Sequence, residues 1–263
     1  MTHDAIGFGT WPFQGDDAER AVATAVEAGY RLIDTATKYG NEAAVGRGLR
    51  ASGVDLRELR IQTKLRGDDH GDVRGALGRS LEALGVDALD AWLIHWPLPM
   101  LGRYPEAWAE MVRLREEGLV REIGVSNFLP EHLDALERAT GVRPAVNQIQ
   151  CDPTIARGGL RDELRARGIG VQAWSPLGRG GEVLRAEPVL RIAAARGLTP
   201  AEVVLAWHGT LGIVPIARSA DAARQRQNLA AVALRLDADE LAVLAGLPQR
   251  GLGDFDPRLR DER

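Results

Sequence analysis

Residues Ile33-Asp34-Thr35-Ala36-Thr37-Lys38-Tyr39-Gly40-Asn41-Glu42 connect an apolar run to a polar loop. The run Tyr30–Ile33 ends in the carboxylate of Asp34, and the phenol of Tyr39 follows five positions later. A short apolar run bounded in this way is consistent with a buried strand. The stretch therefore predicts a strand whose end carries two groups that can take part in proton transfer.

The same pattern recurs in the next two apolar runs. Lys64 follows the run Leu59–Thr63, and His95 follows the run Ala91–Ile94. Asp, Tyr, Lys and His side chains thus stand at the ends of three consecutive strand-like segments. Because all four groups can hold or move protons, this placement makes the chain a candidate enzyme.

The whole chain alternates between strand-like and helix-like segments. Apolar residues recur at three- and four-residue spacing in stretches such as Ala18–Ala28 and Tyr104–Glu117, as in an amphipathic helix. Such alternation predicts a parallel sheet with right-handed crossovers. Eight strand-like runs within 263 residues favour α/β architecture closed into a (β/α)8 TIM barrel, with residues 1–263 as a single domain. The runs are Ala5–Gly9, Arg31–Asp34, Arg60–Thr63, Ala91–His95, Glu122–Val125, Ala145–Gln150, Gly170–Trp174 and Ile213–Ile216.

Composition narrows the class of protein. The formal charge is -4 and basic residues are scattered, so neither nucleic acid nor an anionic membrane is an expected partner. The single cysteine, Cys151, allows no internal disulfide and fits a reducing compartment. No apolar run approaches the ~20 residues that span a membrane, and Met1–Arg20 lacks the apolar segment of a signal peptide. We expect a soluble cytoplasmic protein.

Polar residues that follow the predicted strands should meet at one face, because barrel active sites lie at the C-terminal ends of the strands. Alone, each has a simpler explanation: Lys64 with Asp34 could be a structural ion pair, and His95 a satisfied core histidine. Their shared position favours a common site. The residues are Asp34, Lys64, His95, Ser126, Asn127, Gln148, Trp174, Ser175, Arg218 and Ser219.

The four proton-handling residues suggest one reaction. A tyrosine hydroxyl, with an ordinary pKa of about 10, donates a proton near neutrality only where its phenolate is stabilised. The ammonium of Lys64 could supply that stabilisation, and Asp34 could keep the ammonium protonated. His95 could donate a hydrogen bond to a substrate carbonyl oxygen. This set predicts carbonyl reduction with Tyr39 as the general acid.

The motifs of the chain, taken in order, resemble the aldo-keto reductase family over nearly the full length. The resemblance implies a TIM barrel that binds NADP(H) without a Rossmann domain, and a catalytic tetrad of Tyr39, Lys64, Asp34 and His95. It also implies a small carbonyl substrate and a monomer. The motifs are Gly7-Phe8-Gly9-Thr10-Trp11, Tyr39-Gly40-Asn41-Glu42, His95-Trp96-Pro97, Gly124-Val125-Ser126-Asn127-Phe128, Asn147-Gln148, Trp174-Ser175-Pro176-Leu177-Gly178 and Ile216-Ala217-Arg218-Ser219.

The resemblance also assigns residues to each part of NADPH. Those for the nicotinamide carboxamide are Ser126, Asn127 and Gln148; Trp174 would stack on the ring, and Ser175 and Leu177 would wrap the pyrophosphate. Those for the adenosine 2′-phosphate are Arg218, Ser219 and Arg224, and those for adenine are Gln227 and Asn228. Two guanidiniums around one phosphate favour NADPH over NADH. No metal site is expected, because the histidines lack ligand-like spacing.

The chain also departs from the family pattern. Arg218 stands where many relatives have lysine, and the first strand begins near Ala5, which leaves an N-terminal hairpin short or missing. The loop after His95 is brief and the tail beyond Leu247 is short, so we expect a shallow, open substrate pocket. We expect Asp68-Asp69-His70 to be a solvated loop.

Two other functions are consistent with the same residues. The first is a non-catalytic NADPH-binding or redox-sensing module on the same barrel. The second is a Schiff-base aldolase or lyase that uses Lys64, since barrels host such chemistry. The complete set of proton-handling residues favours the NADPH-dependent reductase over both.

Overall fold

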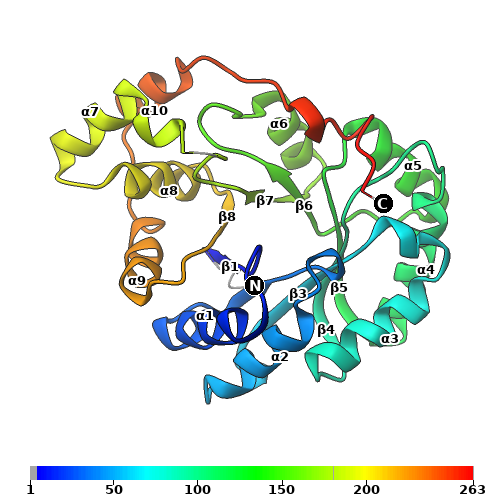
Figure 1. The fold of residues 1–263 in the computed structure, drawn as a ribbon. Coiled ribbons are helices and arrows are strands. Elements are labelled where there is room, and N and C mark those ends of the chain that lie inside the picture. Colours follow the sequence, from blue (N-terminus) through cyan, green and yellow to red (C-terminus); the bar gives the residue numbers. More distant parts are fainter. Residues whose placement is uncertain (1–4, 180, 263) are drawn as a thin grey trace.

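The computed structural model describes residues 5–179 and 181–262. Eight parallel strands form a closed barrel in which each strand is hydrogen-bonded to the next and β8 pairs with β1. Helices surround the barrel (Figure 1). The predicted (β/α)8 barrel is therefore confirmed.

All eight apolar runs of the sequence form strands, and no strand end differs from its run by more than two residues. Such differences are usual at the ends of elements, where hydrogen bonding fades. Among the described residues, β1 is the first strand. The strands are β1 (Gly7–Gly9), β2 (Leu32–Asp34), β3 (Arg60–Leu65), β4 (Leu89–Ile94), β5 (Val120–Ser126), β6 (Val146–Gln150), β7 (Gly170–Trp174) and β8 (Val214–Ala217).

The helices follow the strands, with two of them, α7 and α8, between β7 and β8. Short 3-10 turns matter at the site: η1 (Thr37–Tyr39), η3 (Gly67–Gly71) and η5 (Gly253–Phe255). The helices are α1 (Gly15–Ala28), α2 (Glu42–Ala51), α3 (Val73–Leu84), α4 (Tyr104–Glu116), α5 (Pro130–Thr140), α6 (Gly158–Ala166), α7 (Glu187–Arg196), α8 (Pro200–Thr210), α9 (Ala222–Ala231) and α10 (Ala238–Ala245).

Helices α1 and α2 show how the sequence builds the outer layer. The buried residues of α1 recur at three- and four-residue spacing, and the helix ends at Gly29, whose φ of 114° suits a residue without a Cβ. Gly46 of α2 lies directly against the end of α3, where a Cβ would overlap the carbonyl oxygen of Leu84. Small residues at such points let neighbouring helices pack closely on the barrel.

The layer between strands and helices forms the main core. Trp92 of β4 and Trp108 of α4 are fully buried there, which confirms the apolar helix face predicted from the sequence. Lys64 is also fully buried, although its side chain is charged. Because a buried ammonium needs partners, this residue marks a polar centre inside the barrel.

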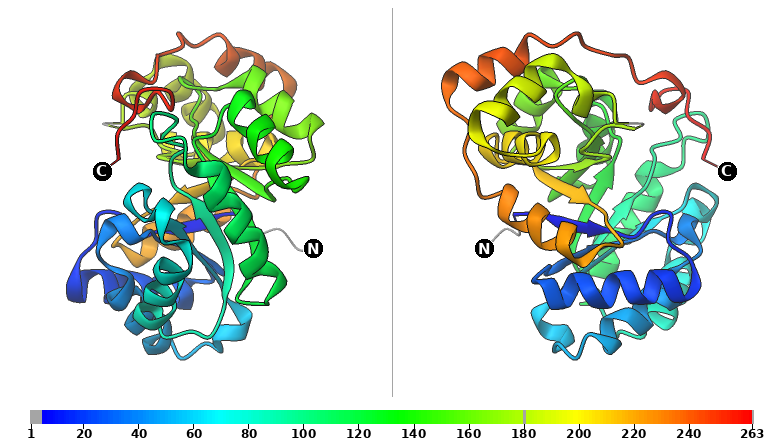
Figure 2. Two further views of the ribbon diagram at one scale, coloured as in Figure 1. Left: turned by 90° about the vertical axis from the view of Figure 1, so that its right-hand side faces the viewer. Right: turned by 60° about the vertical axis from the view of Figure 1, so that its left-hand side comes forward.

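The segment after α10 returns across the molecule. Figures 1 and 2 show this tail, in red, leaving α10 and crossing over to the side of the barrel where α4 and α5 lie. Its last described residue, Glu262, is only 3% exposed. Within the described ranges, no helix is both long enough and apolar enough to cross a membrane.

Candidate active site

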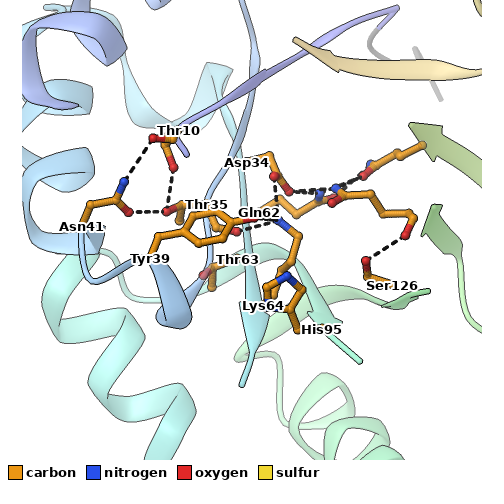
Figure 3. A network of polar contacts seen from close by, with 12 residues as sticks. Thr10, Asp34, Thr35, Tyr39, Asn41, Gln62, Thr63, Lys64, His95 and Ser126 are labelled. Atoms are coloured by element: carbon orange, nitrogen blue, oxygen red, sulfur yellow. Dashed lines mark hydrogen bonds and ion pairs between the residues drawn. The ribbon is translucent and has the colours of Figure 1, made fainter. Parts of the chain in front are cut away.

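A buried ion pair lies at the end of the barrel. Asp34, the last residue of β2, places Oδ2 2.6 Å from Nζ of Lys64 on β3, and both side chains are almost completely buried. The Lys64 ammonium also donates to the Thr35 carbonyl oxygen at 2.9 Å and to the Tyr39 hydroxyl at 3.5 Å. The structure thus brings together three of the four predicted proton-handling residues (Figure 3).

Two glutamines hold the other oxygen of Asp34. The amide groups of Gln62 on β3 and Gln148 on β6 donate to Oδ1 at 2.6 and 2.9 Å. Gln172 of β7 accepts from both amides and donates back to Gln62. The sequence analysis did not predict Gln62 or Gln172 as site residues. Side chains two positions apart on a strand share a face, so Gln62 could have been found from its spacing to Lys64.

Tyr39 lies on the turn η1, directly after β2. Its main-chain carbonyl oxygen accepts a hydrogen bond of 2.8 Å from the Gln14 amide. Nearby, the Thr35 hydroxyl donates to the Asn41 side chain at 2.9 Å, and Asn41 donates to the Phe13 carbonyl oxygen at 2.9 Å. These bonds tie the loop that carries the phenol to the loop after β1, so Tyr39 is held on a fixed backbone.

His95 follows β4 and completes the set. Its main-chain N–H donates to the Leu65 carbonyl oxygen at 3.1 Å, which continues the pairing of β3 with β4. The imidazole ring stands edge-on to the Tyr39 ring, with 5.9 Å between their centroids. Its Nδ1 lies 2.5 Å from Oε1 of Glu262 in the tail. No local pattern in the sequence pointed to Glu262, because the contact depends on the path of the tail.

Burial and neighbouring charges shift the pKa values of Lys64 and Tyr39 in opposite directions. Burial alone would lower the pKa of Lys64, but the charges of Asp34 and then Tyr39 more than offset it, so the pKa is raised. Burial raises the pKa of Tyr39 above its ordinary value, although the Lys64 ammonium opposes that rise. Lys64 is therefore charged at neutral pH, and Tyr39 is protonated. Contrary to the expectation of a more acidic tyrosine, the Lys64 charge lowers the pKa of Tyr39 only in part, because burial outweighs it.

The residues predicted for the nicotinamide lie beside His95. The Ser126 hydroxyl donates to the Gln148 carbonyl oxygen at 2.8 Å, and the Asn127 amide donates to the His95 carbonyl oxygen at 3.2 Å. The indole N–H of Trp174 donates to Oδ1 of Asn127 at 2.8 Å. Asn127 adopts a left-handed φ of 64°, and its amide is held by hydrogen bonds to the His95 carbonyl oxygen and the Trp174 indole.

Ser175 and Leu177, predicted for the pyrophosphate, directly follow β7. Ser175 adopts a left-handed φ of 49° in the turn, and both side chains are half-buried. A non-glycine residue in this conformation is uncommon in loops and is often retained at binding sites. The loop is thus an ordered turn next to Trp174 and not an extended linker.

The residues predicted for the 2′-phosphate surround the N-terminus of α9. Arg218 and Arg224 are exposed, and Ser219 accepts a hydrogen bond of 3.0 Å from the main-chain N–H of Asp221. A helix N-terminus flanked by guanidiniums suits a phosphate, because the helix dipole and the charges act together. The Asp221 carboxylate also caps this N-terminus by accepting from the main-chain N–H of Arg224, and the role of Arg218, Ser219 and Arg224 at the 2′-phosphate stays a prediction.

The two residues predicted for adenine are engaged within the protein. The Gln227 amide forms a hydrogen bond with Glu202 of α8, where it helps to lower the pKa of that carboxyl against the effect of burial. Asn228 is buried, and its side chain forms a hydrogen bond with the hydroxyl of Tyr30. Asn228 is thus buried whereas Gln227 is partly exposed, and the role of both residues at adenine stays a prediction.

The tail changes the expected form of the pocket. Phe255 on η5 packs against Trp174 and Trp96, with ring centroids 5.5 and 6.3 Å apart. Glu262 lies further along the same tail, beside His95. The expectation of a shallow pocket left open by a short tail is therefore wrong. The roughly fifteen residues after Leu247 can span tens of ångströms when extended, at ~3.3 Å per residue. This is enough to reach the mouth of the barrel, the face formed by the C-terminal ends of the strands.

The turn after β3 also differs from its prediction. His70 on η3 is 4% exposed rather than solvated, and neither ring nitrogen has a hydrogen-bond partner among the described residues. Burial lowers the pKa of His70 to about 4. This histidine is therefore a neutral packing residue at neutral pH, because its neighbours shield it from water.

Neither cysteine chemistry nor metal binding has support in the described part of the chain. Cys151 is buried, and burial raises the pKa of its thiol to about 12, so it is a packing residue as predicted. Within the same ranges, no group of three or more His, Cys, Asp or Glu side chains has an arrangement that could hold a metal ion.

Comparisons with known proteins agree with this geometry. The profile of the Aldo/keto reductase family matches residues 5–247. The chain is 43% identical over 258 residues to 2,5-diketo-D-gluconic acid reductase B of Corynebacterium sp. (strain SHS752001), covering 97% of this chain and 93% of that protein. It is 42% identical to methylglyoxal reductase DkgA of Salmonella typhimurium, covering 93% of this chain and 89% of that protein.

Solved structures of aldo-keto reductases also resemble this chain. A variant of Gox0644 crystallised in complex with NADPH superposes with a TM-score of 0.90 at 37% identity, over 96% of this chain and 93% of that chain. An aldo-keto reductase of Bombyx mori in complex with NADP gives 0.84 at 31% identity, over 92% of this chain and 88% of that chain. Fold, motif order and sequence identity thus agree over nearly the whole chain, which belongs to the aldo/keto reductase family.

Proposed function

We propose that this protein uses NADPH to reduce an aldehyde or a ketone to an alcohol. The observation that carries the proposal is the buried Lys64–Asp34 pair, whose ammonium lies 3.5 Å from the hydroxyl of Tyr39. An ion pair that served stability alone would not need a tyrosine hydroxyl at its end. The reductases among the relatives, and structures of relatives that hold NADPH, support the same reaction class.

The residues around the mouth fit NADPH. Asn127 and Trp174 would hold the nicotinamide end, and Arg218 and Arg224 at the start of α9 would hold the 2′-phosphate. Gln227 and Asn228 take a smaller part in the proposal, because both amides already have partners. When bound, the cofactor supplies two electrons and a hydrogen to the carbonyl carbon.

Tyr39 would supply the matching proton. As the carbonyl oxygen gains negative charge, the O–H bond of Tyr39 breaks, a new O–H bond forms on the substrate, and a phenolate remains. The Lys64 ammonium faces that phenolate, and Asp34 keeps the ammonium charged. His95, edge-on to the Tyr39 ring, would donate a hydrogen bond to the same carbonyl oxygen and orient it.

The relatives suggest which substrates to test first. Two of them are named for compounds with two carbonyl groups, 2,5-diketo-D-gluconic acid and methylglyoxal. The tail packs Phe255 against Trp174 and places a carboxylate beside His95, which narrows the space around these residues. A small substrate suits this enclosed mouth better than a bulky one, so we propose small dicarbonyl compounds as the substrate class.

Initial rates against a panel of carbonyl compounds test the proposal. The panel holds small dicarbonyls, simple aldehydes and simple ketones, each with NADPH and with NADH, and consumption of the reduced cofactor is followed by absorbance. We expect turnover with NADPH and the highest kcat/KM for a small dicarbonyl. Tight NADPH binding without turnover of any carbonyl would contradict the proposal and favour the non-catalytic module.

A further inference from the structure

Glu262 holds one of the least exposed carboxylates of the described chain, and each of its oxygens lies against a polar group. Its Oε1 lies 2.5 Å from Nδ1 of His95, and its Oε2 accepts a hydrogen bond of 3.1 Å from the main-chain N–H of Gly67. The ammonium of Lys38 donates to its main-chain carbonyl oxygen. A carboxylate that is 3% exposed is stable only when such partners compensate for its lost hydration.

This carboxylate is ionised at neutral pH. Burial alone would raise the pKa of Glu262, but His95, the N–H of Gly67 and the charge of Lys38 more than offset burial, so the pKa lies below its ordinary value. The group beside His95 is thus an anion. Nδ1 of His95 and Oε1 of Glu262 meet as an ion-pair contact, and neither atom has a hydrogen-bond partner among the described residues.

The protonation state of His95 decides whether it can serve both the observed contact with Glu262 and the proposed contact with the substrate. A neutral imidazole carries one proton. With that proton on Nδ1, Nε2 would present a lone pair to the substrate oxygen; with it on Nε2, Nδ1 would present a lone pair to the carboxylate of Glu262. Both contacts are favourable only in the doubly protonated imidazolium, which has an N–H on each nitrogen.

We propose that Glu262 is a positioning residue that holds His95 as an imidazolium, with Nε2–H directed at the substrate carbonyl oxygen. This inference rests on the proposed reduction for its catalytic consequence. A charged donor stabilises the developing oxyanion more strongly than a neutral one. The tail would therefore serve the reaction as well as enclose the mouth.

Other charged groups lie around the pair and its neighbours. Positive charges come from Lys38 on η1, from Lys64 behind Tyr39 and from Arg103 next to His70 on η3. Asp34 is engaged by Lys64, Gln62 and Gln148. In the described ranges, Glu262 is the carboxylate that forms an ion pair with His95.

The tail has anchors that do not involve Glu262. The guanidinium of Arg260 lies 5.0 Å from the Phe255 ring centroid and 5.7 Å from that of Trp96. The guanidinium of Arg179, from the loop after β7, lies 4.3 Å from the Phe255 ring. Since cation–π contacts hold the tail at the mouth, the change Glu262→Gln is expected to remove the charge without releasing the segment.

The test compares Glu262→Gln with the wild type. Protein labelled with ¹⁵N at its five histidines is titrated by NMR, and the His95 signals are assigned with His95→Asn. We expect both ring nitrogens of His95 to stay protonated to a higher pH in the wild type than in Glu262→Gln, because the variant lacks the adjacent carboxylate charge. Identical titrations in the two proteins would overturn the proposal. This readout needs neither cofactor nor turnover.

Kinetics supply the second readout. For Glu262→Gln, the upper limb of the pH profile of kcat/KM should move toward acid by the same interval, about tenfold in rate per pH unit, while the Kd for NADPH stays unchanged. Glu262→Asp keeps the charge and should recover part of both effects. Asp254→Asn removes a carboxylate from an exposed position of the same tail and should change neither.

The outcomes separate the two proposals. If the His95 titration moves as expected and the wild type reduces no carbonyl, the proposed reduction fails while the Glu262 ion pair stands. If the wild type is an active reductase whose His95 titration and pH profile do not change in Glu262→Gln, the ion pair has no role in His95 protonation and this inference fails.

Discussion

The change Asp34→Asn tests the polar centre of the barrel through stability. The wild-type carboxylate accepts from Lys64 on one oxygen and from Gln62 and Gln148 on the other. An asparagine has one acceptor oxygen and one amide that only donates. In either orientation of the new side chain, its amide group would therefore face either the ammonium or the two glutamine amides.

The structure sets the size of the effect. Coulomb's law for charges 2.6 Å apart, with an effective dielectric constant of about 20, gives roughly 6 kcal/mol of attraction that the variant loses. The ammonium can instead lose its proton, which at pH 7 costs about 5 kcal/mol from an ordinary pKa near 10.4. Removal of one partner from a buried pair typically costs about 3–5 kcal/mol. We expect a loss of unfolding free energy in that range.

Urea unfolding at pH 7, fitted for both midpoint and m-value, measures this loss. If Lys64 loses its proton in the variant, the unfolded chain binds more protons than the folded one below the ordinary pKa of lysine. The deficit relative to wild type should then shrink as the pH rises toward that value. Asp17→Asn removes one partner of an exposed ion pair and should have no measurable effect. A loss below ~1 kcal/mol for Asp34→Asn would refute the reasoning.

Three further predictions follow from other parts of the molecule. Gly46→Ala should lower the unfolding free energy by about 1–3 kcal/mol in the same urea assay, because the added Cβ overlaps the Leu84 carbonyl oxygen. Gly78→Ala on α3 is the control, because the site has open space for a Cβ, and it should raise the unfolding free energy by up to ~1 kcal/mol. The pKa of His70 is about 4 in the fold against an ordinary 6.5, so the unfolded chain binds the proton first as the pH falls, and stability should drop by about 3 kcal/mol between these values. His70→Phe should lose that part of the pH dependence, and an unchanged pH profile of unfolding would contradict the assignment. Arg218→Ala and Arg224→Ala should weaken binding of NADPH much more than binding of NADH in fluorescence titrations, since the guanidiniums would contact only the 2′-phosphate; equal losses for both cofactors would exclude that role.

The sequence predicted the barrel because its signals are local and repeated. Each strand is a short apolar run, and Asp34, Lys64 and His95 each stand where such a run ends. Parallel strands place these ends at one face, so residues separated by up to 61 positions could be predicted to meet. The distances then confirm that Asp34, Lys64 and Tyr39 are in contact.

Other features depend on contacts between segments that no local pattern encodes. Glu262 reaches His95 only because the tail crosses the mouth, and a polar residue near a chain's end looks like any exposed one. His70 sits in a polar turn, yet neighbouring segments bury it. Gln227 and Asn228 are predicted for adenine by position along α9, whereas their partners on α8 and before β2 decide where the amides point.

A single-turnover experiment with Tyr39→Phe tests the central claim most directly. Enzyme saturated with NADPH is mixed with the best carbonyl substrate, and oxidation of the cofactor is followed in both proteins. We expect the Kd for NADPH to stay the same and the single-turnover rate to fall by about 10²–10⁴-fold, because only the proton donor is lost. A Tyr39→Phe rate equal to that of the wild type would contradict the role of Tyr39 as the acid.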